Sequence, residues 1–356
     1  MRQKKAMIAM SGGVDSSVAA FLMQKEGFDC CGGTLFLCDE ALTGVFTPSP
    51  AQDAQAVADK LNIPFYTFDA REEFKALVAE PFVTAYEQGL TPNPCIFCNR
   101  NIKFSLLLEK ALALGCSHIV TGHYARIRKD EATGRYLLYK APDKNKDQSY
   151  FLAGLTQHQL SHCCFPLGEL TKDQVRAIAE EQGFINARKK DSQDICFIPG
   201  GDYVAFMERY RGSGYPEGAY LDLSGKEVGR HKGAVGYTLG QRKGLGIALG
   251  APVYVCDKDM RANTVTVGPE EALFATTLIA ENWNFLPFET LDAPLPVYAK
   301  VRYRHDAQSA TVYPMEDGKA KVVFDAPQRA ITPGQAVVLY DKDMVVGSGT
   351  ITKVEK

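Results

Sequence analysis

A glycine turn between an apolar strand and a helix places the strongest constraint on what this chain can fold into. The apolar run 6–10 leads into Ser11-Gly12-Gly13-Val14-Asp15-Ser16-Ser17, and apolar residues then recur at helical spacing. Two glycines let the backbone approach a phosphate closely, and the free N–H groups at a helix start favour an anion. The turn therefore predicts a nucleotide-phosphate site, with an ordinary strand-to-helix turn capped by serine as the alternative.

Strand-like and helix-like segments alternate through the first half of the chain. Short apolar strands are predicted at 6–10, 29–37, 64–68 and 118–122, and helices at 51–61, 74–86 and 104–114. This alternation predicts an α/β domain in which helices cover both faces of a parallel sheet. Ligands in such a domain bind beyond the carboxyl ends of the strands, which is where the glycine turn lies.

The second half of the chain has a different pattern. From about residue 212 the helical spacing disappears, and short β-rich runs alternate with Gly, Pro and Asp turns. Before that point, 126–139 is predicted to form a hairpin that turns near Gly134, and Thr171 with Gln174 resembles a capping box that begins a helix. We predict a nucleotide-binding catalytic domain over 1–210, a small central domain over 211–275 and a C-terminal β-barrel over 276–356.

Charge and hydropathy exclude several classes of protein. The 356 residues include 40 Lys and Arg and 42 Asp and Glu, a net charge of −2, so a nucleic acid would have to be held by local basic clusters. No apolar run reaches the ~18 residues that a membrane helix needs, and the apolar stretch after the basic start is too short for a signal peptide. We therefore expect a cytoplasmic protein without a membrane partner.

Ten cysteines in a chain of this length are too sparse for a disulfide scaffold and indicate free thiols, metal ligands or catalysis. Most are expected to be small buried hydrophobic residues, because their neighbours are apolar or form turns. These are Cys30, Cys31, Cys38, Cys116, Cys163, Cys164 and Cys256. Cys95, Cys98 and Cys196 are the cysteines that we single out for function.

The glycine turn resembles the PP-loop of ATP pyrophosphatases, whose pattern is Ser-Gly-Gly-x-Asp-Ser. It does not match the Walker A pattern, because no Lys-Ser or Lys-Thr pair ends the loop. The resemblance implies that ATP is cleaved between its α and β phosphates, that AMP is transferred to a carbonyl-type oxygen and that pyrophosphate leaves. Asp15 is a candidate ligand for Mg²⁺, which prefers carboxylate and phosphate oxygens.

Sequence blocks along the whole chain resemble the motifs of bacterial tRNA-specific 2-thiouridylases. They are found, in order, at 91–104, 121–125, 146–152, 190–197, 240–246, 302–304 and 333–335. One such block can match by chance, whereas seven in order do not. The resemblance implies that the protein uses ATP to place sulfur on C2 of the wobble uridine of tRNA.

The resemblance also implies which residues form the site. The ATP pocket would use Ala9, Met10, Ser11, Gly12, Gly13, Val14, Asp15, Ser16, Leu35 and Gly122. The tRNA contacts would come from His123, Lys146, Asp147, Gln148, Arg302, Tyr303, Arg304 and Gln335. Cys196 would carry the incoming sulfur as a persulfide, and Cys98 would be its reactive partner. The sulfur donor would be a cysteine desulfurase, a sulfur-carrier protein or sulfide.

The chemistry of sulfur transfer sets a condition on both cysteines. Only a thiolate attacks, so each cysteine needs surroundings that lower its pKa. We expect Arg100 and Lys103 to do so for Cys98, and Lys189 and Lys190 for Cys196. After the outer sulfur has been delivered, a disulfide between the two cysteines would form by thiol exchange, and a cellular reductant would reopen it.

One position departs from the commonest family pattern, because many members carry Asp where this chain has Cys95. The change creates Cys95-x-x-Cys98, which together with Cys196 offers three thiolates. A structural zinc site needs four ligands, whereas a 4Fe–4S cluster on three cysteines would leave one iron open for sulfur. The sequence leaves open a persulfide relay, a cluster on these three cysteines, and a Cys95 that takes no part or is a simple dithiol partner.

Two functions of other kinds also stay open. A PP-loop ligase would adenylate a small acid and would need no cysteines, so it should survive Cys98→Ser and Cys196→Ser. A tRNA-binding module with a degenerate nucleotide site would release no pyrophosphate in the presence of tRNA.

Overall fold

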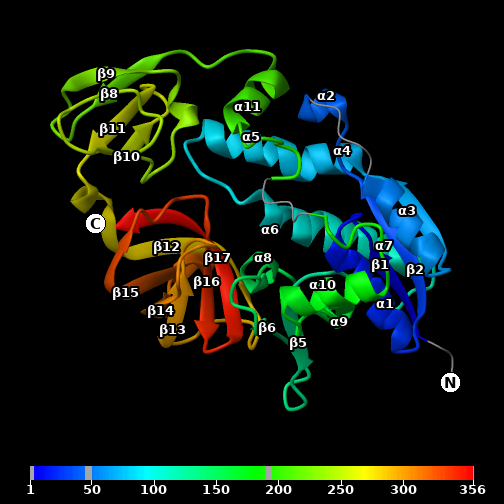
Figure 1. Ribbon diagram of the computed structural model, residues 1–356. Coiled ribbons are helices and arrows are strands. Elements are labelled where there is room, and N and C mark those ends of the chain that lie inside the picture. The colour runs from blue at the N-terminus through cyan, green and yellow to red at the C-terminus, as the bar shows by residue number, and fades with distance from the viewer. Residues whose placement is uncertain (1–3, 45–49, 190–194, 356) are drawn as a thin grey trace.

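The computed structural model describes residues 4–44, 50–189 and 195–355. Three bodies are visible in Figure 1: a helix-covered sheet built from the first part of the chain, a small β unit, and a barrel that contains the C-terminus. This arrangement confirms the predicted fold class, an α/β domain followed by a small middle domain and a C-terminal β-barrel.

The first body is built on a parallel sheet. Within the described residues its strand order is β3-β2-β1-β4-β7, and every pair is parallel. The strands are β1 (Lys5–Ala9), β2 (Asp29–Phe36), β3 (Phe65–Asp69), β4 (His118–Val120) and β7 (Cys163–Cys164). Both faces of this sheet are buried, as parallel strands require.

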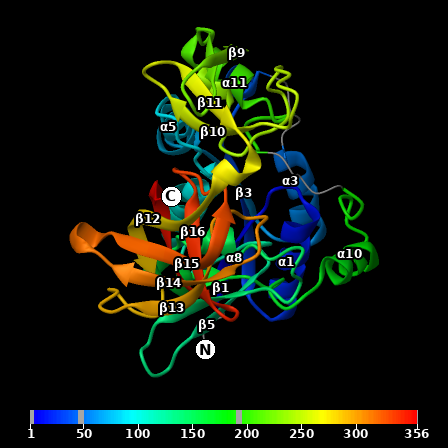
Figure 2. The ribbon, with the colours of Figure 1, turned by 90° about the vertical axis from the view of Figure 1, so that its left-hand side faces the viewer.

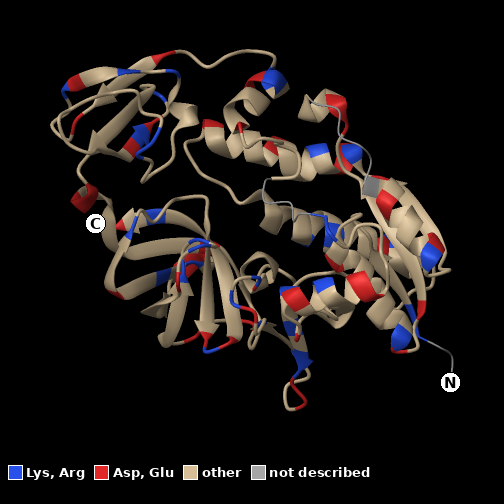
Figure 3. Cartoon of the chain, in the orientation of Figure 1, with Lys and Arg blue, Asp and Glu red and all other residues tan. Residues whose placement is uncertain are grey.

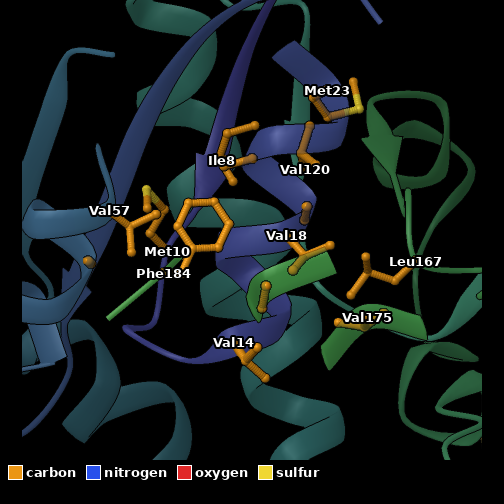
Figure 4. Packing of buried hydrophobic residues seen from close by; sticks show 14 of the residues in the cluster. Ile8, Met10, Val14, Val18, Met23, Val57, Val120, Leu167, Val175 and Phe184 are labelled. Carbon is orange, nitrogen blue, oxygen red and sulfur yellow. The ribbon is translucent and has the colours of Figure 1, made fainter. Parts of the chain in front are cut away.

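Helices cover the two faces of the sheet, as predicted. Side chains of β1 alternate, so that Ala6 and Ile8 face one cluster and Met7 faces the other. The first cluster is closed by α1 (Val14–Lys25), α3 (Pro50–Lys60) and α10 (Lys172–Glu181), and Figure 4 shows its packing. The second cluster is closed by α7 (Leu107–Ala113) and α8 (Ser149–Leu152).

Two of the predicted helices are irregular. The segment predicted at 74–86 runs as α4 (Arg71–Phe74), the π-helical η1 (Lys75–Ala79) and α5 (Glu80–Glu87). The helix predicted at 104–114 begins earlier, with α6 (Pro94–Cys98) and the π-helical η2 (Asn99–Leu106) before α7. Short helices are α2 (Glu40–Thr43) and α9 (Gln157–Ser161). π-helical turns occur frequently at functional sites, and η2 directly follows Cys98.

The predicted capping box is present at the start of α10. The Thr171 side chain accepts a hydrogen bond from the Gln174 N–H, and the Gln174 side chain accepts from the Thr171 N–H. These bonds satisfy main-chain donors that the first helical turn leaves unpaired.

The middle unit is a sheet with the strand order β10-β11-β8-β9. Its strands are β8 (Gly218–Leu221), β9 (Glu227–His231), β10 (Tyr254–Asp259) and β11 (Thr264–Gly268). The helix α11 (Tyr203–Arg211) leads into it and is fixed to α5, since Arg211 pairs with Glu80 and Glu87, each at 2.9 Å. The short helical turn η3 (Ala234–Gly236) lies between β9 and β10, and η4 (Glu270–Leu273) lies between β11 and the first strand of the barrel.

The last body is a closed barrel, seen best in Figure 2. The described strands follow the order β12-β15-β14-β13-β16-β17, and pairing of β12 with β17 closes the ring. They are β12 (Phe274–Phe285), β13 (Leu295–Lys300), β14 (Gln308–Pro314), β15 (Ala320–Arg329), β16 (Ala336–Asp341) and β17 (Met344–Glu355), with the turn η5 (Glu316–Gly318) between β14 and β15. Small and branched apolar side chains fill the interior.

The predicted hairpin forms, but it joins the barrel. Strands β5 (Ala125–Lys129) and β6 (Tyr136–Lys140) pair with each other, and β6 also pairs with β17 through Tyr139 and Met344. A segment of the first predicted domain therefore extends the sheet of the third. Among the described residues, no helix has the length and apolar character needed to span a bilayer.

Candidate functional site

The glycine turn lies at the carboxyl end of β1 and opens α1, as predicted. Gly12 has a φ of 67°, and Gly13 occupies the N-cap of α1 without a side-chain capping bond. The turn is held from inside by serine hydroxyls: Ser16 Oγ donates to the Gly13 carbonyl oxygen at 3.0 Å, and Ser17 Oγ donates to the same oxygen at 3.1 Å. The N-terminal end of α1 is therefore presented to a ligand, and its dipole favours an anion there.

The Asp15 carboxylate is held by two side chains that the sequence analysis did not single out. Lys172 Nζ lies 2.8 and 2.9 Å from the two carboxylate oxygens, and the Tyr124 hydroxyl donates to Oδ1 at 2.7 Å. The Lys172 side chain is only 9% exposed. A carboxylate accepts about four hydrogen bonds, so Asp15 keeps capacity for a magnesium ion that also binds phosphate.

The chain that follows α10 closes over the glycine turn. Asn186 Nδ2 donates to the Gly12 carbonyl oxygen at 3.2 Å and to Ser17 Oγ at 2.9 Å. Lys189 Nζ donates to the Gly12 carbonyl oxygen at 3.2 Å and to Asp53 Oδ2 at 2.7 Å. These bonds bring the approach to Cys196 beside the phosphate-binding loop, although 190–194 lie outside the described residues.

The other predicted ATP residues converge on the same edge. A Cβ on Gly122 would lie 2.7 Å from the Asp15 main-chain carbon, so the close approach of the two segments requires glycine there. Ala9 and Met10 end β1, and Leu35 lies near the end of β2. The Met10 and Val14 side chains are buried in the core, so at these positions only the main chain can face a nucleotide.

Cys98 and Cys196 come from distant parts of the chain to one cluster. Cys98 ends α6 and is buried with Phe82 and Phe197. Phe197 directly follows Cys196 and is 1% exposed, and its ring contacts the rings of Phe74, Phe82 and Phe206 at centroid distances of 5.3, 5.4 and 5.2 Å. Phe197 therefore holds Cys196 beside the cluster that contains Cys98, close enough for the charges of the two cysteines to interact.

Several predicted tRNA contacts have partners within the protein. The half-buried His123 ring packs against the rings of Phe104 and Phe165, and its Nδ1 lies 2.7 Å from Thr121 Oγ1. Burial, with a smaller contribution from the Lys103 charge, holds the pKa of His123 well below its usual value, so the ring is neutral at physiological pH.

The turn around Asp147 is also held from within. Asp147 Oδ1 accepts from the Ala141 and Ser149 N–H groups at 3.0 and 3.2 Å, and Gln148 Oε1 accepts from the Tyr124 N–H at 3.0 Å. Lys146 lies half-buried on the same turn.

Arg302, Tyr303 and Arg304 differ in their surroundings. The Arg302 guanidinium donates to the Leu239 and Ala330 carbonyl oxygens and to Thr332 Oγ1, so it joins the middle unit to the barrel. Tyr303 packs on Phe151 at a centroid distance of 4.3 Å. Arg304 is exposed.

Comparisons with known proteins cover the whole chain. Family models match as a tRNA methyl transferase HUP domain over residues 4–200, a tRNA methyl transferase PRC-barrel domain over 204–269 and an aminomethyltransferase β-barrel domain over 275–351. The tRNA-specific 2-thiouridylase MnmA of Clostridioides difficile is 47% identical over 98% of this chain and 98% of its own. That of Treponema denticola is 48% identical over 99% of both chains. The chain belongs to the tRNA-specific 2-thiouridylase family.

The relatives that match over nearly their full length carry the 2-thiouridylase name, so the family follows them and not the methyl transferase wording of the domain descriptions. A solved U34-tRNA thiolase from Methanococcus maripaludis with its [4Fe-4S] cluster is 18% identical over 59% of this chain and 66% of its own, with a TM-score of 0.34. That likeness is too low to support an argument about a 2-thiouridylase.

The prediction of low thiol pKa values at the candidate site is wrong for this structure. Desolvation by the surrounding protein raises the pKa of Cys95 and of Cys98, and it raises that of Cys196 to about 12, although only Cys98 is a buried residue and Cys95 and Cys196 are exposed. Lys103 lowers all three, but by less than burial raises them. Lys189 is instead bound to Asp53 and the glycine turn, and Lys190 lies outside the described residues.

A further thiol lies at the candidate site and was not predicted. Cys38, expected to be a buried small hydrophobic residue, is half-exposed and packs against the cluster that contains Cys98. Burial, Asp39 and Cys98 raise the pKa of Cys38, and Cys38 in turn contributes to the raised pKa of Cys196. Its position follows the carboxyl end of β2, which is the only signal in the sequence that places it near the site.

Alkylation of Cys196 is expected to depend on pH over an unusually wide range. The thiolate is the reactive form, and an ordinary cysteine thiol stops gaining reactivity above its pKa of about 8.5. Because the pKa of Cys196 is raised to about 12, its alkylation rate should still rise about tenfold per pH unit from pH 8 to pH 10. Iodoacetamide labelling with peptide mass spectrometry measures this; a plateau near pH 8 would contradict it.

Neutralising the two arginines should separate RNA binding from stability. Arg304→Ala is expected to reduce the slope of log Kd for tRNA against log salt by about 0.7 to 0.9, because one phosphate contact is lost. Arg302→Ala is expected to lower the melting temperature, because the acceptors that Arg302 now binds lose their donor. Binding assays at several salt concentrations and a thermal melt distinguish the two. An unchanged slope for Arg304→Ala removes Arg304 from the footprint.

Proposed function

We propose that the protein is an ATP-dependent tRNA-uridine 2-sulfurtransferase of the cytoplasm, which thiolates C2 of the wobble uridine. One observation carries the proposal: the glycine turn follows β1, while Leu35 and Leu37, at the end of the neighbouring β2, pack against the cluster of Cys98, whose charge also acts on Cys196. The relatives in Clostridioides difficile and Treponema denticola, named as tRNA-specific 2-thiouridylases, support it. The three domains would divide at about residues 210 and 275.

The first step activates the uridine. The N-terminal end of α1 binds ATP phosphates, and Lys172 and Lys189 supply positive charge beside them. The C2 oxygen of the uridine attacks the α phosphorus, the bond to the β phosphate breaks, and pyrophosphate leaves. Magnesium bound by Asp15 and the phosphates would neutralise charge on the leaving group. The adenylated oxygen is then a good leaving group.

The second step delivers sulfur. The Cys196 thiolate attacks the outer sulfur of a persulfide on a cysteine desulfurase or sulfur carrier, which leaves as a thiol, so that Cys196 carries the persulfide. The Cys98 thiol then loses its proton and attacks Cys196 Sγ. The bond to the outer sulfur breaks, hydrosulfide leaves and a disulfide forms between the two cysteines. Hydrosulfide attacks C2 and AMP leaves, which gives 2-thiouridine. A thiol reductant then supplies two electrons to reopen the disulfide.

The raised pKa values of the two cysteines show what must change when the substrates bind. The raised pKa values of Cys98 and Cys196 keep both thiols protonated at neutral pH in the described structure. Sulfur transfer therefore requires that the two thiols gain contact with water or charged groups when substrates bind, as they would when RNA phosphates and a splayed-out base approach them. Lys103, the cation that lowers the pKa of Cys95, Cys98 and Cys196, is the local source of stabilisation for a thiolate.

A 4Fe–4S cluster on Cys95, Cys98 and Cys196 is the second mechanism that the sequence leaves open. Among the described residues, no three Cys, His, Asp or Glu side chains lie in an arrangement that could hold a metal ion. The residues as placed do not fit a cluster, and we route no step through one. The relay requires Cys98 and Cys196 but not Cys95.

Cys95→Ala separates the two mechanisms. The relay predicts that Cys95→Ala keeps at least about a third of the wild-type rate, since Cys95 takes no bond-forming role. A cluster would be revealed if protein reconstituted with iron and sulfide under anaerobic conditions absorbed near the visible range and lost that absorbance on Cys95→Ala.

The tRNA surface would combine basic residues with aromatic side chains. Figure 3 shows Lys and Arg interspersed with Asp and Glu over all three bodies, so the RNA would be held by local clusters. Lys146 and Arg304 would contact phosphates, and the packed rings of Tyr303 and Phe151 offer a surface on which a base can stack. The target uridine would leave its stack to reach ATP and the cysteines together.

The test is direct. The protein is incubated with ATP, tRNA and a cysteine desulfurase with cysteine, or in parallel with sulfide, with and without iron, and the digested nucleosides are examined for 2-thiouridine while AMP and pyrophosphate are measured; the relay requires the desulfurase sample, because sulfide forms no persulfide without an oxidant. Formation of 2-thiouridine with one AMP per thiolated uridine supports the proposal. AMP and pyrophosphate release that needs no tRNA, gives no 2-thiouridine and survives Cys98→Ser and Cys196→Ser would indicate a ligase, and absence of tRNA-dependent pyrophosphate would indicate a binding module.

A further inference from the structure

A turn of the C-terminal barrel binds the chain just before the helix that carries Cys98. This barrel turn, Pro333-Gly334-Gln335, lies between β15 and β16, and Thr91 lies between α5 and α6. The Thr91 N–H donates to the Pro333 carbonyl oxygen at 2.9 Å. Gln335 Nε2 donates to the Thr91 carbonyl oxygen at 2.7 Å. Both main-chain polar groups of Thr91 are therefore bound by the barrel.

The contact depends on a glycine. Gly334 has a φ of 89°, which side chains rarely adopt, and a Cβ there would lie 2.8 Å from Thr91 N and 2.9 Å from Leu90 Cβ. The two main chains meet more closely than any other residue type would allow. Thr91 is also buried. The barrel turn is therefore shaped to fit this one segment.

The segment from Thr91 to α6 is stiff, so its position carries forward to the cysteines. Pro92 and Pro94 have fixed φ angles. Asn93 Oδ1 accepts from the Cys95 N–H at 3.2 Å and so caps α6. A shift of Thr91 would therefore move the start of α6.

The carboxyl end of α6 is bound to the α/β domain. Asn99 Nδ2 donates to the Phe151 carbonyl oxygen at 3.1 Å, and Gln159 Nε2 donates to the Arg100 carbonyl oxygen at 2.7 Å. The cysteine helix thus spans two bodies, with its start held by the barrel and its end held by the α/β domain.

The barrel turn is itself fixed. The Gly334 N–H donates to the Ile351 carbonyl oxygen at 2.8 Å, and Arg302 donates to Ala330 and Thr332 just before the turn. Arg302 also donates to Leu239 of the middle unit. Continuous hydrogen bonds therefore connect the middle unit, the barrel and the approach to Cys98.

We propose that Gln335 is a positioning residue for Cys98. Through its hydrogen bond to Thr91, Gln335 makes the position of α6 depend on how the barrel packs against the α/β domain. The proposal rests on the proposed function, because it assigns this position to sulfur transfer. An RNA that binds the barrel and the α/β domain together would stabilise this packing of the barrel. Sulfur transfer would then be favoured only when the tRNA is bound.

The test compares two glutamines of the barrel in the full-length protein. Gln335→Met removes the donor to Thr91 at similar side-chain size, and Gln328→Met is the matched control, since Gln328 Nε2 donates to Ala326 of its own strand at 2.8 Å. Without RNA, iodoacetamide labelling of buried Cys98 should be about fivefold faster in Gln335→Met, the effect expected for one hydrogen bond, and unchanged in Gln328→Met.

The RNA-dependent measurements separate positioning from direct contact. In Gln335→Met, 2-thiouridine formation should fall at least about fivefold, while tRNA-dependent pyrophosphate release and the Kd for tRNA stay within about twofold. A weaker Kd with unchanged Cys98 labelling would overturn the proposal and make Gln335 a tRNA contact. If the wild type makes no 2-thiouridine, the proposed function fails, whereas the labelling result still decides the positioning role.

A measurement on the wild type guards against a variant that does not fold. Hydrogen exchange of the Thr91 amide should be slow, because its N–H is bound to Pro333. Exchange as fast as in an exposed loop would show that the barrel turn does not hold the segment in solution, and it would overturn the proposal.

Discussion

Cys98→Ser and Cys196→Ser are each expected to reduce 2-thiouridine formation by at least about 10³-fold while tRNA-dependent pyrophosphate release stays within about threefold. A serine hydroxyl cannot carry a persulfide or form a disulfide, so sulfur transfer stops. In the proposed mechanism, adenylation uses the glycine turn and the cations around Asp15, which neither change touches. Single-turnover assays that quantify 2-thiouridine and pyrophosphate in the same sample measure both effects.

The control for the cysteine variants is Cys164→Ser. Cys164 is half-buried like Cys38, but it lies on β7 in the cluster behind the sheet, away from α6. Thiolation should stay within about threefold of the wild type in this variant. Equal losses in all three serine variants would mean that general destabilisation, and not sulfur chemistry, explains the effect. Full thiolation by either site variant would eliminate the relay.

Local patterns predicted those parts of the fold that local physics determines. The glycine turn, the Thr171–Gln174 capping box and the alternation of strands with helices all follow from neighbouring residues, and each is present. The pairing of β6 with β17 could not be predicted in this way. It rests on Tyr139 and Met344, which lie far apart in sequence, and either strand could have paired elsewhere.

The candidate site shows the same difference between what neighbouring residues predict and what contacts between distant residues determine. Its residue types were predicted, but their electrostatics were not. Lys189 is close to Cys196 in sequence, yet its ammonium binds Asp53 and the Gly12 carbonyl oxygen. Sequence proximity indicates which charges are available, whereas burial, which raises the pKa of Cys196, depends on the rings around Phe197 that arrive from other elements.

Lys172 is the clearest residue that the sequence analysis missed. It begins α10 as one basic residue in an amphipathic helix, where an exposed position is the ordinary expectation. Only the packing of α10 on α1 turns its ammonium toward Asp15. No local pattern records that contact.

Lys172→Met is expected to reduce tRNA-dependent pyrophosphate release by about 10² to 10³-fold. The Lys172 ammonium is almost fully buried beside the glycine turn, where a fixed charge acts on phosphate more strongly than it would in water. Methionine retains most of the apolar packing, so the loss should be in kcat and not in folding. Lys60→Met is the matched control: its Nζ donates to Gly183 at the exposed surface, and its rate should match the wild type.

A double-variant cycle tests whether Lys172 acts through Asp15. If the ammonium both orients the carboxylate and neutralises phosphate, Asp15→Asn and Lys172→Met should each cause a large loss, and the double variant should be little worse than the more damaging single one. Two groups bonded at 2.8 Å share one function, and removing the second partner of a broken pair removes little more. Losses that multiply would assign Lys172 and Asp15 to separate steps, and wild-type pyrophosphate release by Lys172→Met would remove Lys172 from phosphate chemistry.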